Sequence, residues 1–305
     1  MKTLNLNILH KFILVFCLSL VAISCSNDNL DFEESQVVMN EQKKSSKEIN
    51  ESDFRFKPIQ FNDIGVKHNK ALERLYQKLK ENKENNIFTI TDGKTLSNFL
   101  KKELSKPQDY YEANNTNLEL LNNSIDNGLK ISAEIREISD LKINNEKVKN
   151  YLFSLEDIIR SGRNVISRIK DLENNIEKDL TLSNKDLYVL FSATRVGESS
   201  FRYWSKESNS WLQNLNTPRG IVNVQNRVSS NNDCSWLEFS GPNSCIGQLA
   251  STIAVADIIG AVAGAIGAAA VNFVIGPGQV AYAVAILGTG VSTSAAAGMY
   301  WLLEN

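Results

Sequence analysis

The sequence predicts an all-α protein, in which an antiparallel helical bundle is followed by a C-terminal Ala/Gly-rich helical hairpin. Between Phe61 and Leu215, apolar residues recur at intervals of three and four with Lys and Glu between them, and no alternating strand pattern persists. From Ile246 to Asn305 there is no Lys or Arg, and the only acids are Asp257 and Glu304. Two long apolar runs in this segment are separated by Gly276-Pro277-Gly278, a sequence that breaks a helix and turns the chain.

Length and charge set the first limits. With 305 residues, the chain is long enough for one or two domains with a hydrophobic core. The formal net charge is −2. Removing a leader that holds Lys2 and Lys11 takes away two of the 33 basic residues and none of the 35 acidic ones, which leaves about −4. This balance gives no reason to expect nucleic acid as a partner.

Residues that support catalysis or metal binding are scarce. His68 is the only histidine outside the leader, and the cysteines and histidines form no ligand set. No G-x-S-x-G, H-E-x-x-H or phosphate-binding loop occurs. We therefore predict no catalytic residue, no metal site and no cofactor, and we expect that the protein is not an enzyme. His68 itself is expected on the surface of a helix.

Residues 1–24 read as a secretory signal peptide, with a basic start and an apolar core from Phe12 to Ile23. The segment ends in Val21-Ala22-Ile23-Ser24-Cys25, which resembles the lipobox of bacterial lipoproteins, although Ala22 replaces the usual Leu. The resemblance implies that Cys25 is lipidated (palmitate among its acyl chains) and that the anchor is strong. The alternative is an ordinary signal peptide with an incidental cysteine.

Residues 25–58 are predicted to be the lipidated cysteine and a disordered tether, since Asn, Ser, Glu and Lys dominate and little apolar surface is available for burial. An acidic cluster at Asp28, Asp31, Glu33 and Glu34 resembles the surface-export signal of lipoproteins from Bacteroidetes. Ser26 is not the Asp that retains lipoproteins at an inner membrane. The resemblance implies an outer-membrane, cell-surface location; an acidic solvated linker is the alternative.

Residues 59–217 are predicted to form the bundle, with roughly five or six antiparallel helices. The last helix opens near Ser183, a plausible N-cap region, and its aromatic run from Leu187 to Trp204 is expected to face the core rather than a ligand. The apolar stripes are Ala71, Leu72, Leu75, Tyr76 and Leu79; Leu96, Phe99, Leu100 and Leu104; Leu118, Leu120, Leu121, Ile125 and Leu129; and the longest run, from Tyr151 to Leu172.

Residues 218–245 are predicted to be a linker rich in Asn, Ser and Gly. Cys234 and Cys245 are the only cysteines left after the leader is removed and Cys25 is lipidated. Two leftover thiols in an oxidising compartment usually pair, so we expect a disulfide, worth roughly 2 to 3 kcal/mol by the chain-entropy argument. Zinc would need more ligands, and a redox pair is usually spaced as C-x-x-C.

Residues 246–305 are predicted to be the hairpin, with its turn at Gly276, Pro277 and Gly278. Each apolar run is about long enough to cross a hydrocarbon layer of roughly 30 Å. Small residues recur every four positions, and such ridges let helices approach closely in lipid. Asp257 and Asn272 make the first run a marginal membrane span. The expected helix-packing ridge contains Gly260, Gly264, Gly267, Gly290 and Gly298.

The hairpin resembles the hydrophobic helical hairpin of pore-forming colicins and the glycine-zipper segments of two-peptide bacteriocins. It also resembles the glycine-rich tails of Bacteroidetes lipoproteins. The resemblance implies conditional insertion into a target membrane, so a lipid bilayer is the first expected partner. The second hypothesis is a structural or protein-binding lipoprotein, in which the hairpin is the core of a soluble bundle or a site of self-association. Its protein partner is unknown.

Overall fold

The computed structural model describes residues 55–85, 93–106, 115–134, 138–141, 143–214, 245–269 and 278–304. The predicted signal peptide, Cys25 and almost all of the tether lie outside the described residues, as do Cys234, Gly276 and Pro277. The expectations on those residues therefore remain predictions.

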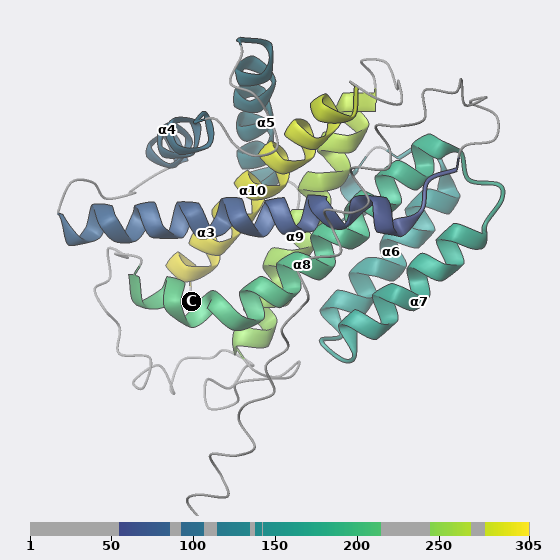
Figure 1. Cartoon of the computed structure of the whole chain (residues 1–305). Helices are drawn as coiled ribbons and strands as arrows, with labels where there is room; N and C mark the ends of the chain where they lie inside the picture. The colour runs from purple at the N-terminus through teal and green to yellow at the C-terminus, as the bar shows by residue number, and fades with distance from the viewer. Residues whose placement is uncertain are drawn as a thin grey trace, which may run out of the picture. The chain divides into compact units, whose positions relative to one another are not determined.

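The described part of the chain is helical and contains no strand, which confirms the all-α class (Figure 1). Short 3₁₀ turns lie at η2 (Pro58–Phe61) and η3 (Ile138–Asp140). The α-helices are α3 (Asn62–Glu84), α4 (Gly93–Leu104), α5 (Asn115–Glu134), α6 (Glu146–Arg160), α7 (Val165–Lys178), α8 (Asn184–Asn214), α9 (Cys245–Ala269) and α10 (Gly278–Glu304).

The longest amphipathic run of the sequence is divided into two helices, α6 and α7. The break contains Gly162 at a φ of 60° and Asn164 at a φ of 50°, both in the left-handed region. Glycine enters this region without steric cost, and Asn does so more readily than most residues. The backbone thus reverses between two helices whose apolar stripes would otherwise continue in register.

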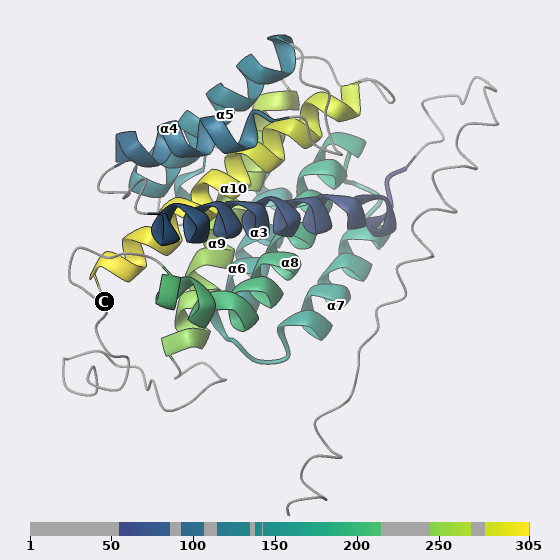
Figure 2. The same ribbon diagram turned by 60° about the vertical axis from the view of Figure 1, so that its left-hand side comes forward.

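The predicted hairpin follows the bundle in sequence but lies inside it. Helix α9 packs most extensively on α10 and α8, and α10 packs also on α5. In both views, α9 and α10 run between the α4–α5 pair on one side and the α6–α7 pair on the other (Figure 2). The segment Gly247–Gly267 is the one helix in the described residues that is long and apolar enough to cross a membrane, and 78% of its apolar window is buried inside the protein.

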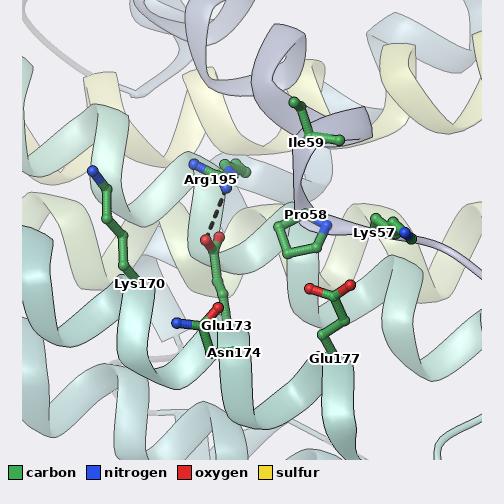
Figure 3. A pocket seen from close by; sticks show the side chains of 8 residues that line it. All are labelled: Lys57, Pro58, Ile59, Lys170, Glu173, Asn174, Glu177 and Arg195. Atoms are coloured by element: carbon green, nitrogen blue, oxygen red, sulfur yellow. Dashed lines mark hydrogen bonds and ion pairs between the residues drawn. The ribbon is translucent and has the colours of Figure 1, made fainter.

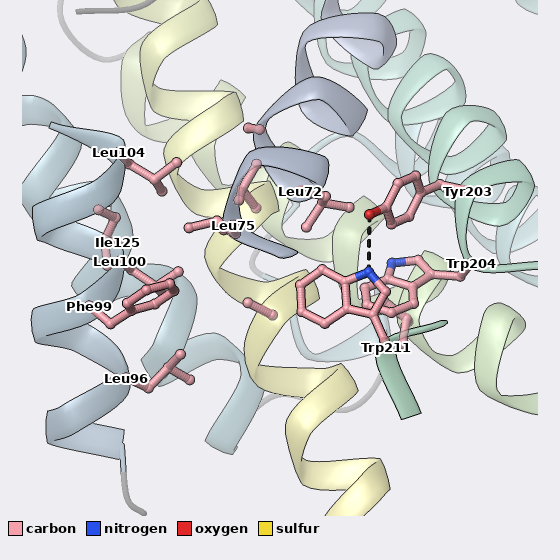
Figure 4. Close-up of a cluster of buried hydrophobic side chains, with 14 of the residues drawn as sticks. Leu72, Leu75, Leu96, Phe99, Leu100, Leu104, Ile125, Tyr203, Trp204 and Trp211 are labelled. Atoms are coloured by element: carbon pink, nitrogen blue, oxygen red, sulfur yellow. Dashed lines mark hydrogen bonds between the residues drawn. The ribbon is translucent and has the colours of Figure 1, made fainter. Parts of the chain in front are cut away.

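The aromatic run of α8 faces the core, as the sequence predicts. Phe191 and Trp204 are fully buried, and Trp204 lies 5.1 Å from Trp211 between ring centroids. Trp211 Nε1 donates a 3.0 Å hydrogen bond to the hydroxyl of Tyr203 (Figure 4). The rings of Tyr203, Trp204 and Trp211 join leucines of α3, α4 and α5 in one hydrophobic cluster: Leu72, Leu75, Leu96, Leu100, Leu104 and Leu121.

Close approach between helices depends on small residues at defined positions. A Cβ added at Gly264 of α9 would lie 2.7 Å from the carbonyl oxygen of Ala285 on α10, and one at Gly260 would lie 2.3 Å from Oγ1 of Thr293. Helix α5 approaches α10 in the same way, because a Cβ at Gly128 would collide with Ser292. The bundle therefore uses its glycines to bring neighbouring backbones together.

Candidate functional site

Four polar side chains meet at the centre of the bundle: His68 of α3, Ser200 of α8, Asp257 of α9 and Ser294 of α10. Each residue has a relative exposure of 0%. We call these four residues the buried polar cluster. Burying polar groups costs free energy unless they are hydrogen-bonded, so such a cluster in an apolar core needs an explanation.

The helix periodicity that builds the core also places these side chains in it. His68 lies four residues after Ile64 and four before Leu72, both of which are buried. Ser200 is related in the same way to Val196 and Trp204 on α8. The expectation that His68 is a surface residue is wrong, because the ring occupies the same stripe as the leucines of α3.

Asp257 is the acceptor around which the cluster is arranged. The hydroxyl of Ser200 donates a hydrogen bond to Oδ2 of Asp257, and Nε2 of His68 lies 3.4 Å from the same oxygen. The Ser294 hydroxyl also interacts with this carboxyl, and it accepts a 3.0 Å hydrogen bond from Nε1 of Trp204. Asp257 thus links α9 to three other helices.

The opposite side of the His68 ring is held by Asn69. Nδ1 of His68 lies 3.1 Å from Oδ1 of Asn69, and Nδ2 of Asn69 donates a 2.9 Å hydrogen bond to the carbonyl oxygen of Ser199. Within the described part of the chain, no hydrogen bond of good geometry reaches Nε2 of His68 or Oδ1 of Asp257. The cluster is therefore only partly satisfied.

Burial dominates the electrostatics of both ionisable groups. It lowers the pKa of His68 to about 4, although Asn69 and the Gly290 carbonyl oppose the shift. It raises the pKa of Asp257 well above its usual value, although the hydroxyls of Ser200 and Ser294 oppose this. In each case the low-dielectric interior disfavours the charged form.

The cluster has the side-chain types of a hydrolase but not their arrangement. Catalysis by a serine needs the imidazole beside the hydroxyl, so that it can accept the proton. Here the Asp257 carboxyl stands between Ser200 and His68, and all three residues are closed off from solvent. No group of three or more His, Cys, Asp or Glu residues suited to a metal occurs among the described residues. The arrangement is suited to holding helices together and holding a proton.

A shallow hollow lies on the surface between the start of the described chain and helices α7 and α8 (Figure 3). Its lining residues are Lys57, Pro58, Ile59, Lys170, Glu173, Asn174, Glu177 and Arg195. Arg195 does not present its charge to a ligand, because its Nη2 lies 2.8 Å from Oε2 of Glu173. Thr194 donates a 2.7 Å hydrogen bond to the other oxygen of Glu173. Burial raises the pKa of Glu173, and the Arg195 charge opposes that shift. These contacts stabilise the α7–α8 packing.

The structure places several of the predicted site residues in the α9–α10 contact. Gly260, Gly264 and Gly290 lie there, and Gly298 packs near Ile253 and Trp204. A Cβ at Gly267 would meet no described atom within 4 Å. Cys245 is the first residue of α9 and Gly278 the first of α10; nothing in the described residues tests the disulfide with Cys234.

Comparison with models of known protein families, with curated proteins and with solved structures finds no match to this chain. The fold and the buried polar cluster therefore carry the functional argument alone.

The sequence contained a signal for half of the cluster. Asp257 stands out as the single acid in an apolar run, and His68 falls on an apolar stripe at four-residue spacing. Ser200 and Ser294 carry no such signal, because each has other serines close to it in the sequence, at Ser199 and Ser292.

Proposed function

We propose that the protein is a lipid-anchored, non-enzymatic protein of the outer membrane, with the hairpin as the structural centre of a water-soluble bundle. Cys25 holds the anchor, the following segment is the tether, and the charged outer helices bind a protein partner. The observation that carries this proposal is the burial of α9, whose apolar window is 78% inside the protein.

The position of the hairpin accounts for its composition without a membrane. A helix surrounded by protein on all sides is apolar all round. Its glycines cost about 1 kcal/mol each relative to alanine in a helix, and close packing offsets that cost. Gly264 against Ala285 and Gly260 against Thr293 are such contacts. Close packing inside the bundle is therefore a sufficient reason for the two ridges of small residues, without packing in lipid.

The outer helix faces have a mixed charge that suits a solvated surface and a protein partner. Ion pairs lie there, such as Lys78 with Glu81 and Lys101 with Asp126. Exposed pairs of this kind contribute little to stability, typically below about 1 kcal/mol. They leave the surface soluble and available for contacts.

A second candidate is conditional insertion of the hairpin into a membrane. The specific observation that favours it is the length of the apolar segment Gly247–Gly267, 21 residues, enough to cross a hydrocarbon layer. In this case the bundle is the stored form. Insertion then requires α9 and α10 to separate from α8 and α5.

Vesicle flotation separates the two candidates. A chain that begins at Ser26 has no lipid anchor, and we expect it to be monomeric and to stay in the aqueous fraction. If this chain floats with vesicles, the first candidate is wrong and the hairpin becomes a membrane element. Gly264→Leu is not a suitable probe, because the larger side chain would meet the backbone of Ala285 and destabilise the bundle itself.

A further inference from the structure

We propose that His68 and Asp257 share one proton in the folded bundle, with Asp257 as a neutral carboxylic acid that donates to Nε2 of a neutral His68. This inference goes beyond the proposed function, since it makes the stability of the bundle depend on proton binding at its centre. It follows from the order of donors and acceptors along one chain of contacts.

The first step is the tautomer of His68. Nδ2 of Asn69 donates to the Ser199 carbonyl, so the amide orientation is set and Oδ1 of Asn69 faces the ring. An amide oxygen can only accept, so Nδ1 of His68, at 3.1 Å, must carry the hydrogen. In a neutral ring, Nε2 then has only a lone pair to offer.

The second step is what surrounds Nε2. Oδ2 of Asp257 lies 3.4 Å away, and the carbonyl of Gly290 also faces the ring. Both are acceptors, and a lone pair directed at acceptors in a buried site is unfavourable. The conflict with Asp257 disappears if one proton lies between Nε2 and Oδ2, and the opposing influence of the Gly290 carbonyl on the pKa of His68 is smaller than that of burial. The pair therefore binds one proton more than a neutral imidazole and a carboxylate would.

The third step assigns that proton to Asp257. Both residues are fully buried, and a neutral pair avoids placing two charges in the apolar core. The hydroxyls of Ser200 and Ser294 contact the carboxyl, but no described Lys or Arg lies within ion-pair distance of it. Arg195 and Arg202, the arginines of α8 before and after Ser200, pair with Glu198 and not with Asp257. The burial-driven pKa directions of His68 and Asp257 agree with this assignment.

The consequence for stability follows from proton counting. Because its pKa is lowered, His68 makes a contribution to the free energy of unfolding that is present above pH 6.5 and is lost as the pH falls to about 4. The raised pKa of Asp257 gives a contribution that is present below pH 3.8 and is lost as the pH rises. Between about pH 4 and 6.5 the effects of His68 and Asp257 on the pH dependence of the free energy of unfolding cancel. Above pH 6.5 the unfolded chain releases a proton that the folded pair keeps, so the pair destabilises the fold as the pH rises.

Asp257→Asn provides the test, because its amide can donate to Nε2 without an ionisable proton. We expect the ratio of the unfolding constants of the full-length wild-type and variant chains to change by about tenfold per pH unit from about pH 5 upward, for as long as the folded pair keeps its proton. The wild-type chain should become less stable relative to the variant as the pH rises. Asp171→Asn, which removes an exposed carboxyl, is the matched control and should follow the wild type. A pH-independent ratio for Asp257→Asn overturns the proposal.

A second measurement keeps the proposal testable if the variant does not fold. The full-length wild-type chain has only two histidines, His10 and His68, so nitrogen-15-labelled histidine yields two sets of ring signals. We expect His68 to be the neutral tautomer with hydrogen on Nδ1 at pH 7, unchanged down to about pH 5. An imidazolium at pH 7, or hydrogen on Nε2 of a neutral ring, would show that Asp257 does not donate the proton.

Discussion

Nε1 of Trp204 on α8 donates a 3.0 Å hydrogen bond to the hydroxyl of Ser294 on α10. Trp204 is among the largest fully buried side chains of the protein, and Ser294 is also fully buried. An indole N–H in an apolar core needs an acceptor, so this bond joins the aromatic cluster to the buried polar cluster. It also connects the hairpin to the helix that covers it.

The first prediction concerns this bond. Ser294→Ala removes the acceptor and leaves the Trp204 N–H unsatisfied, so we expect the free energy of unfolding to fall by about 1–3 kcal/mol. Chemical denaturation followed by tryptophan fluorescence measures it. Ser205→Ala changes an exposed serine of α8, next to Trp204 in the sequence, and should have little effect. Equal effects of the two substitutions would contradict the importance of the bond.

The second prediction compares two glycines of α9. Gly264→Ala places a methyl group 2.7 Å from the Ala285 carbonyl oxygen, and we expect destabilisation by about 1–3 kcal/mol because backbone must move. Gly267→Ala meets no described atom within 4 Å and should be neutral or stabilising by up to about 1 kcal/mol, from helix propensity alone. Thermal unfolding of both variants measures the difference. If Gly267→Ala were as harmful as Gly264→Ala, the close packing of α9 on α10 would not be the cause.

The third prediction concerns the ion pair between Arg195 and Glu173. Arg195→Met leaves Glu173, which is nearly buried, without its cation, and we expect a loss of about 1–3 kcal/mol at pH 7. The pKa of Glu173 is already raised by burial, and it should rise further once the Arg195 charge is removed. A raised carboxyl pKa lowers stability as the pH rises, so the loss should be smaller near pH 4.

Glu173→Gln in the Arg195→Met background is the matched control for that prediction. The double variant has no buried carboxyl, so it should recover stability at pH 7 and lose the additional pH dependence. Denaturant unfolding at the two pH values measures both effects. A loss that is the same at pH 4 and pH 7 would contradict the role given to Glu173.

The fourth prediction tests the second candidate function by locking the hairpin. The Cβ of Ser124 on α5 lies 2.9 Å from the position of a Cβ on Gly288 of α10, so a small shift allows a disulfide between cysteines placed there. If the hairpin inserts into membranes, the oxidised Ser124→Cys/Gly288→Cys variant should not release dye from vesicles, and reduction should restore release. Ser124→Cys alone should behave as the wild type. Equal release before and after reduction would exclude separation of α5 from α10 as the route.

The elements of this fold were largely predictable from local pattern, and the central site was not. The stripes of α3, α4 and α5 and the aromatic face of α8 follow helical spacing, so their buried sides could be read directly. The break between α6 and α7 was missed, because the apolar period continues across Gly162 while the backbone does not. The surface position expected of His68 is wrong because its spacing from Ile64 and Leu72, and not the polarity of its ring, decides which side of α3 it occupies.

The sequence by itself determined that the chain is helical and that it ends in two charge-poor, Gly-rich helices, because periodicity and composition are local properties. Only the tertiary structure decided where the apolar surface of those helices is buried, since protein and lipid satisfy it equally well. The same holds for the proton-binding pair of His68 and Asp257. These residues lie on helices far apart in the sequence, and only the packing of α3 against the hairpin brings them to 3.4 Å.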